Sequence, residues 1–259
     1  SIFFSLAILV FGCTTKIEEK TETELSEQKE KKETLFSNVL TQHSNLTFRN
    51  DLVQTRENNH MINSEFISGA GVAVGDINND GLQDVYFAGN QVQDRLYLNK
   101  GNLQFEDISN SANISNDNKW SSGVTFVDID MDGDQDIYVC RNVYLENAKS
   151  ANQLYINNGD LTFTEKANEY GLDDMGFSMQ AIFFDFDNDQ LIDVYIVNQP
   201  PNIRGVASEI DYAQFSDIKF SDRLYRNTGS GKFIDHTEAG NVRNFGFTLS
   251  ATVGDFNND

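Results

Sequence analysis

One run of nine residues, 128–136, carries the side chains in this 259-residue chain that are best suited to binding an ion. It reads Asp-Ile-Asp-Met-Asp-Gly-Asp-Gln-Asp, which places carboxylates at positions 1, 3, 5 and 9 and a glycine at position 6. Oxygen ligands at this spacing can surround a hard cation, with a further oxygen from the carbonyl of position 7, and the glycine permits the sharp turn. Because five neighbouring aspartates repel one another in an empty loop, the run predicts a bound divalent cation.

The same pattern recurs elsewhere in the chain. Residues 76–84 and 185–193 are complete copies, and residues 255–259 match the first five positions of a fourth. Solvated Asp and Asn turns that bind no metal are the alternative, and such turns are common singly. The recurrence of the 1-3-5-9 spacing favours an array of cation-binding loops.

The flanks of these loops distinguish them from EF-hands. An EF-hand carries a bidentate glutamate at position 12 and lies between two helices, whereas position 12 here is Phe87, Val139 or Ile196. Short runs of β-branched and aromatic residues lead into and out of each loop, as expected of strands. These runs are residues 72–74 and 85–87, 124–126 and 137–139, and 181–184 and 194–197. Each loop is therefore predicted to join two strands.

A second signature follows each complete loop. The pattern Leu-Tyr-x-Asn-x-Gly occurs at 96–101, 154–159 and 224–229, and a phenylalanine stands four residues beyond each glycine, at Phe105, Phe163 and Phe233. The Asn-x-Gly groups are turn signals between strands. Each unit thus contains about four short strands in roughly fifty residues, which is typical of a propeller blade.

All variation in repeat length falls in one connection. The distance from the tyrosine of one repeat to the first aspartate of the next is nearly constant, at 31, 30 and 30 residues. The distance from loop aspartate to tyrosine within a repeat grows from 21 to 27 and then to 40 residues. Insertions confined to one connection project from one face of a repeat array, often the binding face. The longest, 199–221, is a candidate for ligand contact, with a tolerated surface excursion as the alternative.

The N-terminal segment predicts export. Residues 1–12 are almost wholly apolar, too few to span a bilayer, and suited to the hydrophobic region of a signal peptide whose start is truncated. Residues 10–13, Val-Phe-Gly-Cys, resemble the lipobox of bacterial lipoproteins. The resemblance implies cleavage before Cys13, which would then carry lipid and anchor the exported chain at the bacterial outer membrane or cell surface. An ordinary signal peptide with an incidental cysteine is the alternative.

Two segments separate this anchor from the repeats. Residues 13–34 start at the lipidated cysteine and are rich in Lys, Glu, Thr and Ser, a composition that predicts a disordered tether. Residues 35–68 have mixed polarity and are expected to form a short helix and a strand that cap the first repeat. The repeats are expected to occupy residues 69–259.

The repeats resemble a known family. The run Gly-Val-Ala-Val-Gly-Asp-Ile-Asn-Asn-Asp-Gly-Leu-Gln-Asp-Val-Tyr at 71–86, followed by Leu-Tyr-x-Asn-x-Gly, is similar to the VCBS and FG-GAP repeat families, including the related repeats of cartilage acidic protein and the ASPIC/UnbV group. The resemblance implies an all-β fold, a β-propeller of four-stranded blades like the integrin α-subunit head, with Ca²⁺ in the blade loops. Three blades and the start of a fourth do not close a propeller, and we interpret the chain as part of a longer open reading frame.

The resemblance also implies a ligand set, transferred by position. It comprises Asp76, Asn78, Asp80, Leu82 (carbonyl) and Asp84; Asp128, Asp130, Asp132, Asp134 (carbonyl) and Asp136; Asp185, Asp187, Asp189, Leu191 (carbonyl) and Asp193; and, from the partial fourth loop, Asp255, Asn257 and Asp259. Gln190 replaces the glycine at position 6 of the third loop. Because a non-glycine residue at positive φ costs energy, we expect the third loop to bind calcium more weakly.

Composition excludes several classes of protein. The net charge of −21 and the pI of about 4.3 argue against a nucleic-acid partner, whose backbone would be repelled. No nucleophile elbow, His-Glu-x-x-His or P-loop pattern occurs, so no catalytic site and no enzymatic activity are predicted. Cys140 is expected to be a small core residue, with no intramolecular disulfide if Cys13 is lipidated.

Together these features predict a calcium-binding lipoprotein of the cell surface. Its repeats would act as a binding or adhesion module for a protein or glycan partner, with membrane contact only through the lipid anchor. One alternative is the scaffold portion of a larger extracellular enzyme that degrades polysaccharide, with catalysis in sequence beyond this chain. A structural spacer is the other.

Overall fold

A computed structural model of the chain describes residues 35–57, 59–61, 64–114, 120–142, 151–200 and 220–256. The chain divides into two compact units, Ser1–Val39 and Leu40–Asp259, and all of the sheets belong to the second. The predicted signal peptide, lipidated cysteine and tether lie outside the described residues, as do most of the longest insertion and the last two predicted ligands, Asn257 and Asp259. No helix among the described residues is long and apolar enough to cross a membrane.

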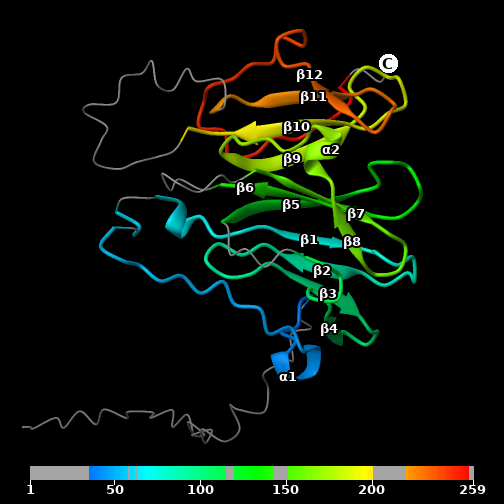
Figure 1. The fold of residues 1–259 in the computed structure, drawn as a ribbon. Helices are drawn as coiled ribbons and strands as arrows, with labels where there is room; N and C mark the ends of the chain where they lie inside the picture. The colour runs from blue at the N-terminus through cyan, green and yellow to red at the C-terminus, as the bar shows by residue number, and fades with distance from the viewer. Residues whose placement is uncertain are drawn as a thin grey trace, which may run out of the picture. The chain divides into compact units, whose positions relative to one another are not determined.

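Three antiparallel sheets of four strands each form the body of the second unit (Figure 1). The strands of each sheet pair with their neighbours in chain order, so every sheet is a simple meander. The first sheet contains β1 (Val72–Gly75), β2 (Asp84–Phe87), β3 (Arg95–Asn99) and β4 (Phe105–Asp107); the second contains β5 (Ser121–Val127), β6 (Asp136–Arg141), β7 (Gln153–Asn157) and β8 (Phe163–Glu165); the third contains β9 (Ser178–Phe184), β10 (Asp193–Asn198), β11 (Arg223–Asn227) and β12 (Phe233–Asp235). The predicted all-β fold and its four-stranded units are confirmed.

The sheets pack face to face in chain order, with β5 between β1 and β9 (Figure 1). Strand β6 shows how the sequence achieves this, because successive side chains of a strand point to opposite faces. Ile137 and Val139 lie in the core shared with the first sheet, whereas Tyr138 and Cys140 lie in the core shared with the third. A strand buried on both faces needs the continuous apolar run that its sequence provides. Cys140 is the small buried core residue that was predicted.

Glycines allow the first strands of the sheets to approach closely. A Cβ on Gly71, beside β1, would lie 2.8 Å from the carbonyl oxygen of Ser122 in β5. A Cβ on Gly123 would meet the carbonyl oxygen of Met179 in β9 more closely still. Both glycines stand five residues before the first aspartate of a loop, at the same place in their repeats. Any larger residue at Gly123 would therefore separate β5 from β9.

A recurrent polar contact, here called the hydroxyl clasp, joins each sheet to the segment that comes after it in the chain. In the first sheet, the buried Asp94 lies just before β3, and its Oδ2 accepts hydrogen bonds from the Tyr86 hydroxyl at 2.8 Å and from Ser121 Oγ of the second sheet at 2.9 Å. The equivalent groups are Asn152 with Tyr138 and Ser178, and Asp222 with Tyr195 and Thr248. A buried carboxylate requires such donors, since an unpaired one would be strongly destabilising.

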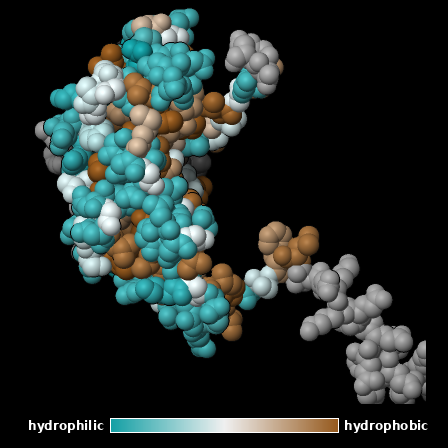
Figure 2. Space-filling view, turned by 90° about the vertical axis from the view of Figure 1, so that its right-hand side faces the viewer, coloured by the Kyte–Doolittle hydropathy of each residue, from teal (hydrophilic) through white to brown (hydrophobic). Residues whose placement is uncertain are grey.

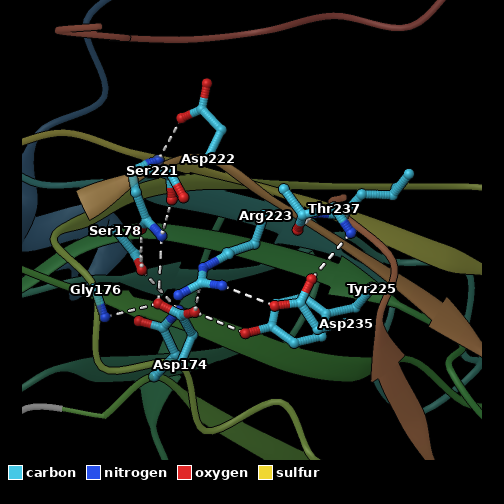
Figure 3. Close-up of polar contacts among 12 residues, drawn as sticks. Asp174, Gly176, Ser178, Ser221, Asp222, Arg223, Tyr225, Asp235 and Thr237 are labelled. Carbon is cyan, nitrogen blue, oxygen red and sulfur yellow. Dashed lines mark hydrogen bonds and ion pairs between the residues drawn. The ribbon is translucent and has the colours of Figure 1, made fainter. Parts of the chain in front are cut away.

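A second polar group ties the second and third sheets together (Figure 3). The buried Asp174 follows helix α2 (Ala167–Tyr170), and its carboxylate accepts hydrogen bonds from the Tyr225 hydroxyl and from the backbone N–H of Gly176, both at 2.7 Å. The Arg223 guanidinium lies between two acids, 3.9 Å from Asp174 Oδ2 and 2.7 Å from Asp235 Oδ2. These contacts fix the position of β11 against the second sheet.

Within the second unit, residues before the repeats contact the first sheet. Helix α1 (Thr41–Ser44) is the short predicted helix, and the Phe48 ring stacks on Phe87 of β2 with ring centroids 5.0 Å apart. The predicted strand is wrong for the described residues of this segment, which pair with the sheet through side chains. For example, Asn50 Nδ2 donates to Asn90 Oδ1, a contact that does not extend into a backbone ladder.

Candidate metal-binding loops

The three predicted loops connect the first and second strands of their sheets and share one hydrogen-bond network. In each loop both carboxylate oxygens of the first aspartate accept backbone N–H groups, from positions 5 and 6. For Asp128 the donors are Asp132 at 3.1 Å and Gly133 at 3.0 Å. The same contacts are made by Asp76 with Asp80 and Gly81, and by Asp185 with Asp189 and Gln190. Position 1 therefore shapes the turn whether or not an ion is bound.

The ninth residue of each loop is a buried aspartate that holds three parts of its sheet together. Asp136 Oδ2 accepts the N–H of Ile129 at position 2, at 3.0 Å, and Oδ1 accepts the N–H of Asn157 at the end of β7, at 2.8 Å. Asp84 and Asp193 make the equivalent contacts. Burial raises the pKa of all three carboxyls, and that of Asp136 to about 7.

Positions 4 and 6 of each loop adopt left-handed backbone conformations. Position 6 has φ of 83° at Gly81, 94° at Gly133 and 70° at Gln190. The glutamine thus occupies a conformation that suits glycine, as the sequence predicted, and it carries the associated conformational strain. The turn is nevertheless the same, because Asp185 still accepts the Gln190 N–H at 2.8 Å.

Carboxylates from positions 1, 3 and 9 converge in two of the loops. One oxygen each from Asp128, Asp130 and Asp136 lie within 4.8 Å of one another, and the same holds for Asp185, Asp187 and Asp193. Every donor in these clusters is a hard oxygen, the ligand type that Ca²⁺ and Mg²⁺ prefer, so the residues fit a hard divalent cation. In the first loop Asn78 replaces the aspartate of position 3.

The other predicted ligands lie outside the two three-carboxylate clusters. The position 5 carboxylates, Asp132 and Asp189, each accept the N–H of position 7, at 2.9 Å in both loops, and stand outside the three-carboxylate clusters. The Asp134 side chain accepts the amide of Asn79 from the first loop at 2.7 Å, so neighbouring loops are in contact. In the partial fourth loop Asp255 is exposed. The carbonyl ligands of position 7 stay predictions.

Comparison with known proteins identifies this arrangement. The family model described as "FG-GAP-like repeat" matches residues 76–139, from the first aspartate of the first loop to the strand that follows the second. Residues 76–139 are thus similar to FG-GAP-like repeats. The resemblance stated from the sequence is confirmed.

The chain is also similar to curated proteins of vertebrates. It is 30% identical over 143 residues to cartilage acidic protein 1 of Xenopus tropicalis, and 29% identical over 143 residues to the mouse and human proteins of that name. Each match covers 52% of this chain and 20% of the relative. The matched part thus spans about a fifth of the length of those relatives.

A hollow of about 280 Å³ lies at the other end of the first strands of the three sheets. It is lined by Gly71, Trp120, Asn142 and Met179, among others, which lie near the start of β1, β5 and β9 or just after β6. The variable connections between second and third strands leave from this same end, whereas the loops lie to the right of the sheets in Figure 1. The face turned to the viewer in Figure 2 is the loop side and is largely hydrophilic.

The hydroxyl clasp was missed by the sequence prediction, although the repeat spacing carries a signal for it. The tyrosine stands ten residues after the first loop aspartate in all three units, as Tyr86, Tyr138 and Tyr195. The Ser or Thr stands seven residues before the next loop aspartate in every case. Alignment of the units on their loops would have found both positions.

Proposed function

We propose that the FG-GAP-like loops bind calcium and that the ions stiffen a propeller-type array of sheets. The observation that carries this proposal is the shared network of the three loops, which holds the carboxylates of positions 1, 3 and 9 close together in the second and third. Like charges at this spacing are unfavourable without a counter-ion, so a bound divalent cation stabilises the folded state.

The array presents a partner-binding face at the end opposite the loops. The hollow lies at that end, where the second strands end and the third strands begin, and insertions of differing length on a rigid scaffold are the usual carriers of binding specificity. The partner is a protein or a glycan, and the protein is exported and held at the bacterial surface by a lipid on Cys13. The role is binding or adhesion, without catalysis.

Thermal unfolding of the full chain tests the calcium proposal. Extracellular calcium modules bind at about 10⁻⁴ to 10⁻³ M, and a ligand that binds only the folded state raises its stability by mass action. We expect millimolar calcium to raise the unfolding midpoint above that in chelator, and magnesium to raise it less. Asp130→Asn should reduce the calcium shift, whereas Glu169→Gln, an exposed charge outside the loops, should leave it unchanged. Equal midpoints in calcium and chelator would exclude a structural calcium site.

Binding assays test the partner proposal. The chain would be assayed against arrays of purified glycans and purified surface proteins, in calcium and in chelator. A matched variant replaces residues 199–221 with a connection as short as that between β2 and β3. Calcium-dependent binding that is lost in the variant supports the proposal. Binding that persists in both chelator and the shortened variant would locate the partner site elsewhere.

A further inference from the structure

We infer that Arg226 is a built-in cation of the third loop, which competes with the divalent ion and leaves this loop folded without metal. The inference rests on the proposed calcium function. It adds that Arg226 makes the third loop less dependent on the ion than the other loops. Arg226 lies on β11, the third strand of the third sheet. Its Nε is 2.5 Å from Asp187 Oδ2, and its Nη2 is 2.8 Å from Asp189 Oδ2.

The two carboxylates held by Arg226 occupy ligand positions. Asp187 is the position 3 residue and belongs to the three-carboxylate cluster with Asp185 and Asp193, and Asp189 is the position 5 residue. The guanidinium binds one oxygen of each, with charge-assisted hydrogen bonds. A divalent ion that binds these same two oxygens must therefore displace the guanidinium.

The equivalent strand positions in the other two sheets carry apolar residues. Leu98 and Ile156 stand immediately before the Asn of the Leu-Tyr-x-Asn pattern, as Arg226 does, and both are buried in the cores between sheets. No ion pair among the described residues involves a carboxylate of the first or second loop. In the first loop, Asn78 Nδ2 donates to Asp80 Oδ2 at 3.0 Å, a neutral contact in place of a charge.

The loops are thus expected to differ in their need for an ion. The second has five aspartates and no cation partner among the described residues, so it depends most on metal. The third has four aspartates and one arginine, and its turn is further strained at Gln190. If the guanidinium occupies the loop in nine molecules of ten, the apparent calcium affinity falls about tenfold.

Replacement of Arg226 tests the inference. Arg226→Leu places at this position the residue type that the first sheet has at Leu98, and Lys232→Gln removes one exposed positive charge from the same sheet without a loop contact. By calorimetric titration of the full chain with calcium, Arg226→Leu should gain a third site or bind it about tenfold more tightly. Adding Asp185→Asn should abolish the gain, which assigns it to the third loop.

Unfolding in chelator gives a second readout that needs no calcium. Arg226→Leu should unfold at a lower temperature than Lys232→Gln, because the four loop carboxylates lose their counter-charge. Equal midpoints of these two variants in chelator would overturn the inference. It would also be overturned if Arg226→Leu left the calcium affinity of the third loop unchanged while the first two loops bind calcium. If no variant binds calcium at all, the proposed calcium function fails, and the chelator comparison still decides the role of Arg226.

Discussion

At the scale of single residues, the loop carboxylates have separate tasks. Asp128, Asp130 and Asp136 all belong to the three-carboxylate cluster, but Asp128 and Asp136 also accept backbone N–H groups that shape the turn and join it to β7. Sequence spacing predicted all three as ligands but could not separate these tasks, because the backbone donors come from other parts of the fold. Sequence spacing could not reveal the contacts of Arg226 for the same reason, since its partners Asp189 and Asp187 lie 37 and 39 positions earlier in the chain.

Backbone strain at position 6 gives a prediction at this scale. Gln190→Gly should stabilise the metal-free protein by about 1 kcal/mol, since glycine adopts positive φ without steric cost. Gly133→Ala is the matched opposite, because a Cβ there meets nothing within 4 Å and only the backbone conformation is penalised. It should destabilise by about the same amount. Urea unfolding in chelator measures both, and changes of the same sign in the two variants would contradict this account.

At the scale of strands and sheets, much of the fold follows from local pattern. The strands on either side of each loop were predicted because alternating apolar residues and turn signals are local features, and β1, β2, β5 and β6 lie where expected. The predicted strand in the cap is absent from the described residues. Such a strand would have to pair with the edge of the first sheet, and this tertiary contact cannot be predicted from the local sequence. The hydroxyl clasp depends likewise on the approach of two sheets, so single strands do not reveal it.

The clasp between the second and third sheets should contribute measurably to stability. Ser178 Oγ accepts from Asn152 Nδ2 at 2.9 Å and donates to Asn198 Oδ1 at 2.8 Å, with all three groups buried. Ser178→Ala leaves both partners short of a hydrogen bond and should cost about 2 kcal/mol. Ser111→Ala, which removes one local hydrogen bond of an exposed residue, should change stability by less than about 0.5 kcal/mol. Equal losses of unfolding free energy in the two variants would show that the clasp contributes little.

At the scale of the whole molecule, charge opposes folding. The chain has 40 acidic and 19 basic residues, an imbalance that destabilises a compact state through self-repulsion. The loops add to this effect because they gather carboxylates on one side of the sheets.

Salt should therefore stabilise the metal-free protein. Raising the ionic strength from about 0.01 to 0.15 M shortens the screening length from about 30 to 8 Å, which weakens repulsion between separate loops. We expect the unfolding midpoint in chelator to rise with sodium chloride, and to rise less in saturating calcium, where bound ions already neutralise the loops. A midpoint in chelator that falls or stays constant with salt would contradict the expectation.

The repetition of the hydroxyl clasp has a consequence for how such chains evolve. The first and second sheets each provide the tyrosine and the Asp or Asn of a clasp, and the sheet that follows provides the serine. A gene duplication that adds one whole repeat thus creates two ends that already match their neighbours. The array can lengthen or shorten by entire units without inventing a new interface, while the connections at the far end diverge independently.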